Sequence, residues 1–233
     1  MNKPLIVLAL IVLVIGCETL VHRSATTDIL DNKVQSVPPI SWEQKRGPIA
    51  KEWTKATVEG VTALFASFDK AEDSVLFCPK YKTLTKEQKI TLWTEMFSAI
   101  AFFESSWDPI NRMEESQTSF PDPDPVTGNP VTSEGLLQMS YQDTVNYAHW
   151  LGKGWCGFDW QKDRLRGAND PLKTILDAKI NLACGIKVMA NQIERKGSVI
   201  LSSGVYWSVL KRGGTYSRVE QITAMTKKVQ GCQ

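Results

Sequence analysis

The sequence predicts a mainly α-helical domain that follows an export signal. Apolar residues recur at intervals of three and four over long stretches, helix-capping signals precede those stretches, and the alternating pattern of strands is scarce. The composition, 42% hydrophobic and 22% charged, is typical of a globular protein. A chain of 233 residues can build one core of ordinary size, so we expect one folded domain.

The N-terminus has the features of a targeting segment. Lys3 supplies a positive charge, and residues 5–15 form an apolar run too short to span a bilayer comfortably. The run ends at Cys17 in a sequence that resembles the bacterial lipobox, which implies cleavage after residue 16 and a lipid on the cysteine. Glu18 in place of aspartate implies the outer membrane. We therefore expect a signal peptide at 1–16 and an exported, lipid-anchored protein at the periplasmic face of the outer membrane or at the cell surface; the alternative is a plain signal peptide with a chance cysteine.

Residues 17–47 are polar, lack sustained periodicity and include Pro38 and Pro39, as a flexible tether would. The predicted domain occupies 48–233 and begins with a helix that Pro48 opens and that runs to about Lys70.

Three further helices follow along the chain. Thr85 and Gln88 form a capping box before a second apolar stripe. Asp170 and Pro171 are expected to start a long helix that ends near Gly197. A last helix is expected to be capped by Ser217 and Glu220.

Once Cys17 is assigned to lipid, the cysteines that remain are even in number, Cys78, Cys156, Cys184 and Cys232. Export to an oxidising compartment predicts two disulfides, for which three connectivities exist. We favour Cys156 with Cys184, which close the shortest plausible loop, and Cys78 with Cys232. The alternative is four buried free thiols.

The sequence lacks the features that would indicate several other functions. The formal charge is +2, which gives no basic footprint for nucleic acid. The chain has two histidines and no zinc-binding, thiol-redox or phosphate-loop motif. We expect no metal, no organic cofactor and a monomer.

Glu104 is the strongest candidate for chemistry. It stands seven residues after Phe97 and four after Ile100, which places it on the apolar face of its helix. Burial disfavours the carboxylate and raises its pKa, so this group could hold a proton near neutral pH, as cleavage of a glycosidic bond requires. The alternative is a glutamate at a helix end that turns to solvent or caps nearby amides.

The surrounding residues resemble a known family. Residues 104–109 (ESSWDP) are similar to the signature of soluble lytic transglycosylases and goose-type lysozymes, and 133–139 (SEGLLQM) resemble their second motif, followed by Thr144. Asp170, Pro171 and Tyr206 match the third region in order. The resemblance covers roughly residues 85–215 and implies a lysozyme-like fold and a peptidoglycan muramidase.

The resemblance also implies residue roles. Glu104 would be the catalytic acid, Ser105 would help to orient it, and Gly135 would allow close approach of the sugar. Gln138 and Tyr206 would line the cleft; the alternatives are a surface amide for Gln138 and a core aromatic for Tyr206. Aromatic residues that could stack on sugars, or serve the core, are Trp107, Trp150, Trp155, Trp160 and Trp207. Trp207 departs from the family, which has asparagine there.

The reaction outcome is open between two mechanisms. A lytic transglycosylase needs one glutamate and forms a 1,6-anhydro end, whereas an inverting hydrolase needs a second carboxylate to activate water. Glu134, Asp122 and Asp124 are the candidates for that carboxylate, so we favour hydrolysis, although loop carboxylates can serve solubility alone. The stretch between the first two motifs is also longer than the family's usual one.

Residues 105–134 form a strongly acidic segment, with six acidic residues against one basic residue and a net charge of −5. This charge predicts selection for a cationic, de-N-acetylated glycan. A solvated loop and a calcium site at Asp122 and Asp124 are the alternatives. The function predicted is cleavage of the β-1,4 bond between N-acetylmuramic acid and N-acetylglucosamine in peptidoglycan strands; a glycan-binding module without activity, or a structural lipoprotein with chance motif matches, would be other classes.

Overall fold

The computed structural model describes residues 39–233, and its fold is mainly helical, as predicted. The predicted signal peptide at 1–16, the lipidation site Cys17 and most of the expected tether lie outside the described residues. Within residues 39–233, no helix combines the length and the apolar character needed to cross a membrane.

The folded part begins before Pro48, where the tether was expected to end. Helix α2 (Ser41–Arg46) precedes α3 (Pro48–Ala63) and α4 (Phe65–Phe68). Trp42 is fully buried, and its indole nitrogen donates to Thr54 Oγ1 at 2.8 Å. The backbone nitrogen of Ser41 donates to the buried carboxylate of Glu95 at 3.0 Å. A segment this short shows no periodicity, so only its tertiary contacts reveal that it belongs to the core.

Helix α6 (Lys86–Ser105) is the central helix, and it follows α5 (Ser74–Phe77) and the short 3₁₀ helix η1 (Tyr81–Thr83). The predicted capping box is confirmed: Thr85 Oγ1 accepts from the backbone nitrogen of Gln88, and Gln88 Oε1 accepts from that of Thr85. Residues 90–101 of α6 are buried on every face, as expected of a helix enclosed by α2, α3 and the C-terminal helix α11 (Val219–Thr226).

The acidic segment forms a β-hairpin. Strand β1 (Arg112–Glu114) pairs antiparallel with β2 (Thr132–Glu134), with Arg112 opposite Glu134 and Met113 opposite Ser133. Residues 115–131 connect the two strands. Since side chains alternate across a strand, the hairpin presents two faces with different residues.

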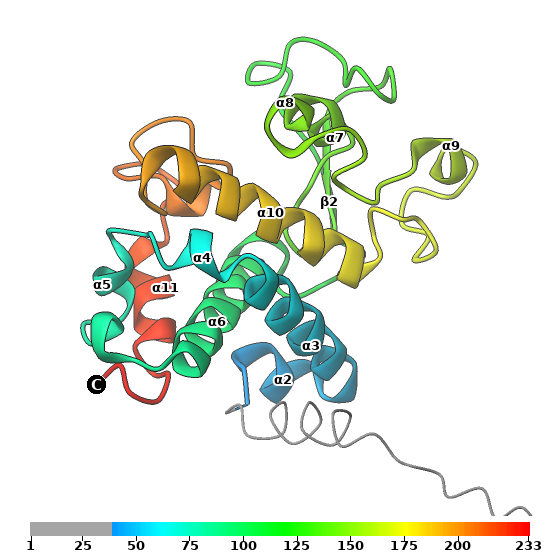
Figure 1. The fold of residues 1–233 in the computed structure, drawn as a ribbon. Coiled ribbons are helices and arrows are strands. Elements are labelled where there is room, and N and C mark those ends of the chain that lie inside the picture. The colour runs from blue at the N-terminus through cyan, green and yellow to red at the C-terminus, as the bar shows by residue number, and fades with distance from the viewer. Residues whose placement is uncertain (1–38) are drawn as a thin grey trace, which may run out of the picture. The chain divides into compact units, whose positions relative to one another are not determined.

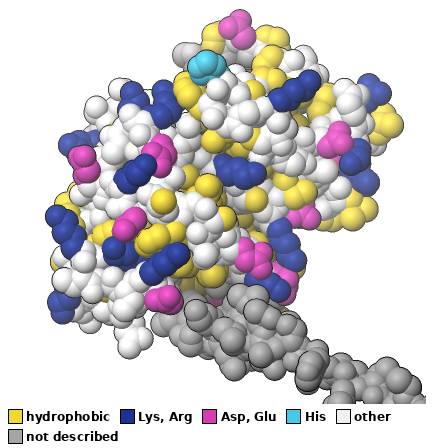
Figure 2. Space-filling model, in the orientation of Figure 1, with side chains coloured by type: hydrophobic (Ala, Val, Ile, Leu, Met, Phe, Trp, Pro, Cys, Tyr) yellow, Lys and Arg dark blue, Asp and Glu magenta, His cyan; other side chains and the backbone are white. Residues whose placement is uncertain are grey.

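Beyond the hairpin lie α7 (Asp143–Asn146), α8 (Ala148–Leu151), α9 (Trp160–Asp163), α10 (Ala178–Lys196), the 3₁₀ helix η2 (Ser208–Leu210) and α11 (Val219–Thr226). Helix α10 runs between the part built from α3, α6 and α11 and the part that holds the hairpin, α7, α8 and α9 (Figure 1). On the face seen in Figure 2, acidic and basic side chains are interspersed.

Two predicted helix starts were wrong. Helix α10 begins at Ala178 rather than at Pro171, because the side chain of Asp177 caps it by accepting from the backbone nitrogens of Lys179 and Ile180. Leu172, expected in the helical stripe, is exposed instead. The predicted end is confirmed, since Gly197 closes α10 in a left-handed conformation. Helix α11 follows Arg218, and Ser217 makes no capping bond to it.

Both predicted disulfides are present. Cys78 is bonded to Cys232, and Cys156 is bonded to Cys184. Disulfides form and persist in oxidising compartments, so they indicate an exported protein.

Candidate active site

Glu104 lies in the last turn of α6, and its carboxyl oxygen Oε1 is buried without a hydrogen-bond partner among residues 39–233. Burial, as the larger cause, and the negative charge of Glu115, as the smaller one, together raise the pKa of this carboxyl to about 7. A buried polar atom without a partner is costly, so a ligand or a water that supplies the missing hydrogen bond would be favoured at Glu104.

The end of α6 is held in place by its own motif. Ser105 Oγ lies 2.9 Å from the carbonyl oxygens of both Ala101 and Leu136, so it ties the helix end to the segment after β2. Ser106 and Trp107 adopt positive φ angles of 54° and 60°, which turn the chain away from the helix. The indole nitrogen of Trp107 donates to the Ser98 carbonyl at 2.7 Å, and this ring belongs to the core.

The second motif packs against α10. Gly135 has a φ angle of 81°, and a Cβ there would lie 2.4 Å from Asn181 Nδ2. The Asn181 side chain donates to the carbonyl oxygens of Glu134 and Ile175 and accepts from the backbone nitrogen of Leu137. Gly135 is therefore required by this contact with α10, whereas the sequence suggested an approach to the sugar.

Gln138 also faces the protein interior. It has a positive φ of 49°, and its side-chain amide donates to the carbonyl oxygens of Gly135 at 2.8 Å and Asn111 at 3.3 Å. These bonds brace the turn that follows β2. They correct the picture of a surface amide, since the side chain is buried.

Tyr206 is brought close to Glu104 and to a residue that the sequence did not single out, Asp143. The Tyr206 hydroxyl donates to Asp143 Oδ2, which also accepts from the Ser140 backbone nitrogen at 2.8 Å. Burial raises the pKa of Asp143 to about 7. The pKa of Tyr206 lies well above its usual value because of burial, with the charges of Asp143 and Glu104 adding to the effect.

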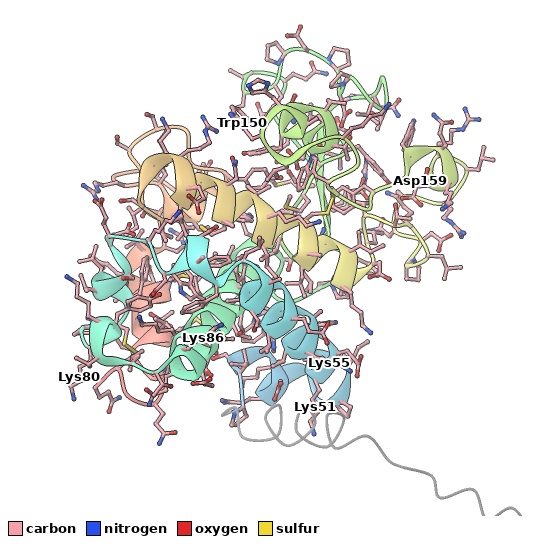
Figure 3. All side chains as sticks on the ribbon, in the orientation of Figure 1. Lys51, Lys55, Lys80, Lys86, Trp150 and Asp159 are labelled. Atoms are coloured by element: carbon pink, nitrogen blue, oxygen red, sulfur yellow. A yellow bond between two sulfur atoms is a disulfide. The ribbon has the colours of Figure 1, made fainter. Side chains whose placement is uncertain are left out.

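Trp207 is 2% exposed and donates from its indole nitrogen to the Leu137 carbonyl at 2.8 Å. This position in the core corrects the expectation that it would bind substrate. Trp155 is also buried, whereas Trp160 is half-buried and lines a pocket. Trp150, on α8, is 46% exposed (Figure 3). The Arg195 guanidinium lies over its ring, 3.8 Å from the ring centroid.

Glu115 is the carboxylate that lies near Glu104, and the sequence did not single it out for that role. It follows β1 directly, accepts a hydrogen bond from the Ser133 hydroxyl, and donates from its backbone nitrogen to Val131 at 2.9 Å. Strand alternation places Glu115 and Ser133 on one hairpin face and Arg112 and Glu134 on the other. The sequence alone did not reveal this position, because the register that separates the two faces comes from the strand pairing.

The three carboxylates proposed from sequence take other positions. Glu134 is 3% exposed and is paired with Lys173 Nζ and, at 3.8 Å, with Arg112 Nε. Burial raises the pKa of Glu134 and these two cations oppose that rise. Asp124 is buried and accepts from backbone nitrogens of its own loop and of Gln142.

These contacts give Glu134 and Asp124 structural roles and correct their assignment as the second carboxylate. Asp122 is exposed in the loop. Within residues 39–233, no group of three or more histidine, cysteine, aspartate or glutamate side chains is placed to hold a metal ion.

No protein-family model matches the chain, and no curated protein matches it. Solved structures of Bd0314 DslA from Bdellovibrio do match. The wild-type DslA structure has 26% sequence identity and a TM-score of 0.63, and the match covers 84% of this chain and 98% of DslA.

Two further DslA structures, each at 25% identity and a TM-score of 0.63, carry a glutamate-to-glutamine replacement. The replaced positions are 143 and 154 in DslA, which are 11 residues apart. Glu104 and Glu115 are separated by the same interval of 11 residues.

Proposed function

We propose that this chain is a peptidoglycan muramidase that hydrolyses the β-1,4 bond between N-acetylmuramic acid and N-acetylglucosamine. The observation that carries the proposal is the pair Glu104 and Glu115, in which a buried carboxyl with an unpartnered oxygen feels the charge of a second carboxylate. The lysozyme-like motifs and the similarity to DslA support it.

Glu104 suits the role of general acid. A glycosidic oxygen leaves poorly unless it receives a proton, so the acid must still be protonated near neutral pH. The pKa of about 7 satisfies that requirement. Because Oε1 has no hydrogen-bond partner among residues 39–233, it is available to form a hydrogen bond with a sugar oxygen.

Glu115 suits the role of general base. In the hydrolytic reaction, Glu115 removes a proton from water as the water oxygen bonds to the anomeric carbon, while Glu104 protonates the leaving oxygen as its bond breaks. The product is a reducing sugar end. The equal spacing of the two glutamates replaced in DslA supports pairing these two residues.

Glu104→Gln tests the assignment of the acid. The change keeps the size of the side chain and removes the transferable proton, so cleavage of purified peptidoglycan should fall by a factor of about 10² to 10⁴. The melting temperature should be retained. Glu59→Gln, at an exposed position of α3, is the matched control. Substantial residual cleavage by Glu104→Gln would refute the assignment.

Mass spectrometry of the digested glycan decides between the mechanisms. Hydrolysis leaves reducing ends, and transglycosylation leaves 1,6-anhydro ends that lack one water molecule. The second carboxylate favours hydrolysis. Anhydro products would show that the reaction is lytic transglycosylation and not hydrolysis. If the wild-type protein released no product, the domain would be a module that only binds glycan.

The acidic hairpin supports a preference for de-N-acetylated glycan. Glu114 and Glu115 belong to a segment whose net charge is −5, and a free glucosamine amine carries a positive charge that carboxylates attract. We expect de-N-acetylated peptidoglycan to be cleaved faster than the fully acetylated wall, with a preference that shrinks as salt rises. Cleavage rates measured on both walls at low salt test this, and equal rates would contradict it.

The proposed location is the periplasmic face of the outer membrane or the cell surface. The disulfides support export, and the lipobox-like sequence at Cys17 supports a lipid anchor. The enzyme would then act as a monomer on glycan strands close to the membrane.

A further inference from the structure

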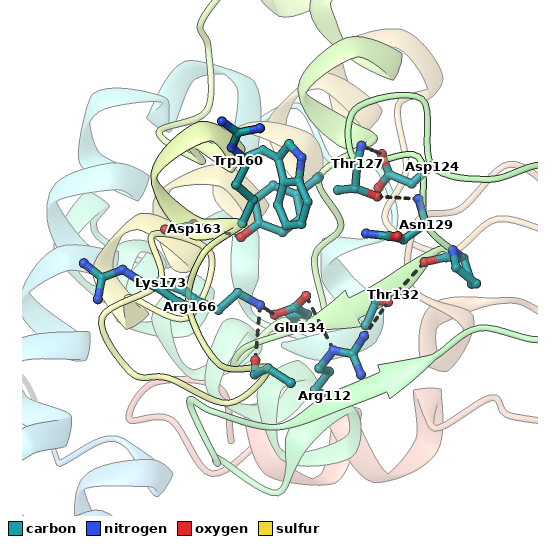
Figure 4. A pocket seen from close by; sticks show the side chains of 14 residues that line it. Arg112, Asp124, Thr127, Asn129, Thr132, Glu134, Trp160, Asp163, Arg166 and Lys173 are labelled. Atoms are coloured by element: carbon teal, nitrogen blue, oxygen red, sulfur yellow. Dashed lines mark hydrogen bonds and ion pairs between the residues drawn. The ribbon is translucent and has the colours of Figure 1, made fainter.

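A pocket of about 220 Å³ lies on the hairpin face that carries Arg112 and Glu134 (Figure 4). Strand alternation places Glu115 on the opposite face. The side chains of Thr132 and Glu134 line this pocket, whereas Ser133 between them bonds to Glu115. The pocket and the candidate active site are therefore separate, but they share strand β2.

The pocket is lined by a row of charges in which Lys173 and Glu134 are buried and the Arg112 side chain is 33% exposed. Lys173 and Arg112 approach Glu134 from two sides, as the dashed lines in Figure 4 show. Lys173 and Glu134 are 4% and 3% exposed, and Lys173 also donates to the Ala168 carbonyl at 3.2 Å. This row is held rigidly, because separating either charge from the other would leave it buried and unpaired.

Carboxylates in the pocket wall are already satisfied by the protein. Asp163 accepts from the Tyr141 hydroxyl and from the backbone nitrogen of Thr174, each at 2.8 Å. Asp124 accepts from the backbone nitrogen of Val126 at 2.8 Å and from other groups of its loop. These acidic groups have little capacity left to bind a cation.

Some cationic side chains of the pocket have N–H groups for which the described residues provide no acceptor. Four cationic side chains line the pocket, Arg112, Arg164, Arg166 and Lys173. Two of them are paired, Lys173 with Glu134 and Arg166 with Asp170 at 3.3 Å. The Arg112 guanidinium has five N–H groups. One nitrogen donates to Thr132 Oγ1 at 3.1 Å, and its contact with Glu134 is long at 3.8 Å. Arg164 is exposed and makes no ion pair within residues 39–233.

We propose that this pocket binds a free carboxylate of a short peptide, with Arg112 and Arg164 as its donors. Arginine pairs with carboxylates through two parallel N–H bonds, and the Trp160 ring on the facing wall can pack against an aliphatic side chain (Figure 4). The volume is below the ~300 to 1,000 Å³ of most ligand pockets, so it suits one or two residues at a peptide end.

The source of the peptide rests on the proposed function: the stem peptides of peptidoglycan carry free carboxylates and hang from the glycan that the cleft would hold. An enzyme with this pocket would bind the wall through its peptide as well as through its sugar. The sites are distinct, so binding at one can be measured without chemistry at the other.

Binding is tested by calorimetry with the Glu104→Gln protein, which removes cleavage from the measurement. The probes are a free stem tetrapeptide, the same peptide with its carboxylates amidated, and glycerol phosphate. We expect the free peptide to bind and amidation to weaken binding by about tenfold or more, as the loss of a charge-assisted hydrogen bond does. Amidated peptide or glycerol phosphate binding as tightly as the free peptide would overturn the proposal.

Arg112→Gln and Arg164→Gln, made separately, should each weaken peptide binding by about tenfold. Arg212→Gln is the matched control, since Arg212 is an exposed arginine that lines a different pocket. Arg112→Gln changes a residue of the hairpin and could disturb its folding. Arg164→Gln changes an exposed side chain, so the proposal can still be tested if Arg112→Gln fails to fold. Peptide affinity unchanged by both would overturn the proposal. If the wild-type protein bound peptide but cleaved no peptidoglycan, only the proposed function would fail.

Discussion

At the scale of single residues, the chemistry of Glu104 depends on what surrounds its carboxyl. Burial is the larger cause of its raised pKa, and the charge of Glu115 is the second. In its proposed role of general acid, Glu104 acts when protonated, so we expect activity below the pKa and a fall in activity as the pH rises through about 7. A shift of one pKa unit corresponds to about 1.4 kcal/mol between the two protonation states.

Glu115→Gln should lower the pKa of Glu104, because it removes a negative charge that disfavours ionisation. Glu114→Gln is the matched control, since Glu114 is paired with Thr132 on the other hairpin face. The measurement is the pH titration of the Glu104 side-chain carbon by NMR. The titration should move to lower pH in Glu115→Gln alone; movement of the same size in Glu114→Gln would contradict the placement of Glu115.

At the scale of elements, the hairpin and α10 together position the candidate site. The hairpin places Glu115 on one face and the pocket lined by Arg112 and Glu134 on the other, and α10 holds the turn after β2 through Asn181. This contact leaves no space for a side chain at Gly135. The second motif is therefore an element of packing as much as of binding.

Gly135→Ala should destabilise the protein by more than Gly128→Ala does. Both glycines have positive φ angles, 81° and 71°, so both changes introduce backbone strain. Only Gly135 adds a clash, with Asn181 Nδ2 at 2.4 Å, whereas a Cβ at Gly128 meets nothing within 4 Å. We expect an extra loss of about 1 to 3 kcal/mol in the free energy of unfolding, measured with urea. Equal losses would show that Asn181 moves freely.

At the scale of the whole molecule, the two disulfides constrain very different lengths of chain. Cys78–Cys232 joins residues 154 apart, from before α6 to the C-terminal end, and Cys156–Cys184 joins residues 28 apart. In the chain-entropy account, a longer closed loop loses more freedom in the unfolded state, so its disulfide stabilises more.

Replacing Cys78 and Cys232 together by alanine should lower the melting temperature more than replacing Cys156 and Cys184. The difference expected from loop length is about 1 to 2 kcal/mol. All four cysteines are buried, so the cavities created are comparable. Calorimetric unfolding of both double variants gives the comparison, and a larger loss from the Cys156–Cys184 pair would contradict the entropic account.

Local patterns were enough to predict the helical fold class, the capping box of α6 and the position of Glu104 on the apolar face of its helix. The even number of cysteines after Cys17 was enough to predict two disulfides. Each of these depends on residues within a few turns of one another, and helical spacing or composition expresses them directly. The end of α10 at Gly197 is of the same kind.

Glu115, the residue proposed as the second carboxylate, was found only in the tertiary structure: strand pairing puts Glu115 and Glu134 on opposite hairpin faces, and it is the charge of Glu115 that acts on Glu104. Glu134 was a candidate from the sequence because nothing local indicated its ion-pair partner, Lys173, which lies 39 residues further along the chain. The interior position of Trp207 and the burial of Trp42 likewise depend on contacts with distant segments. A sequence states which residues are present, but burial and charge pairing depend on which distant residues meet, and those interactions set the chemistry of a carboxyl group.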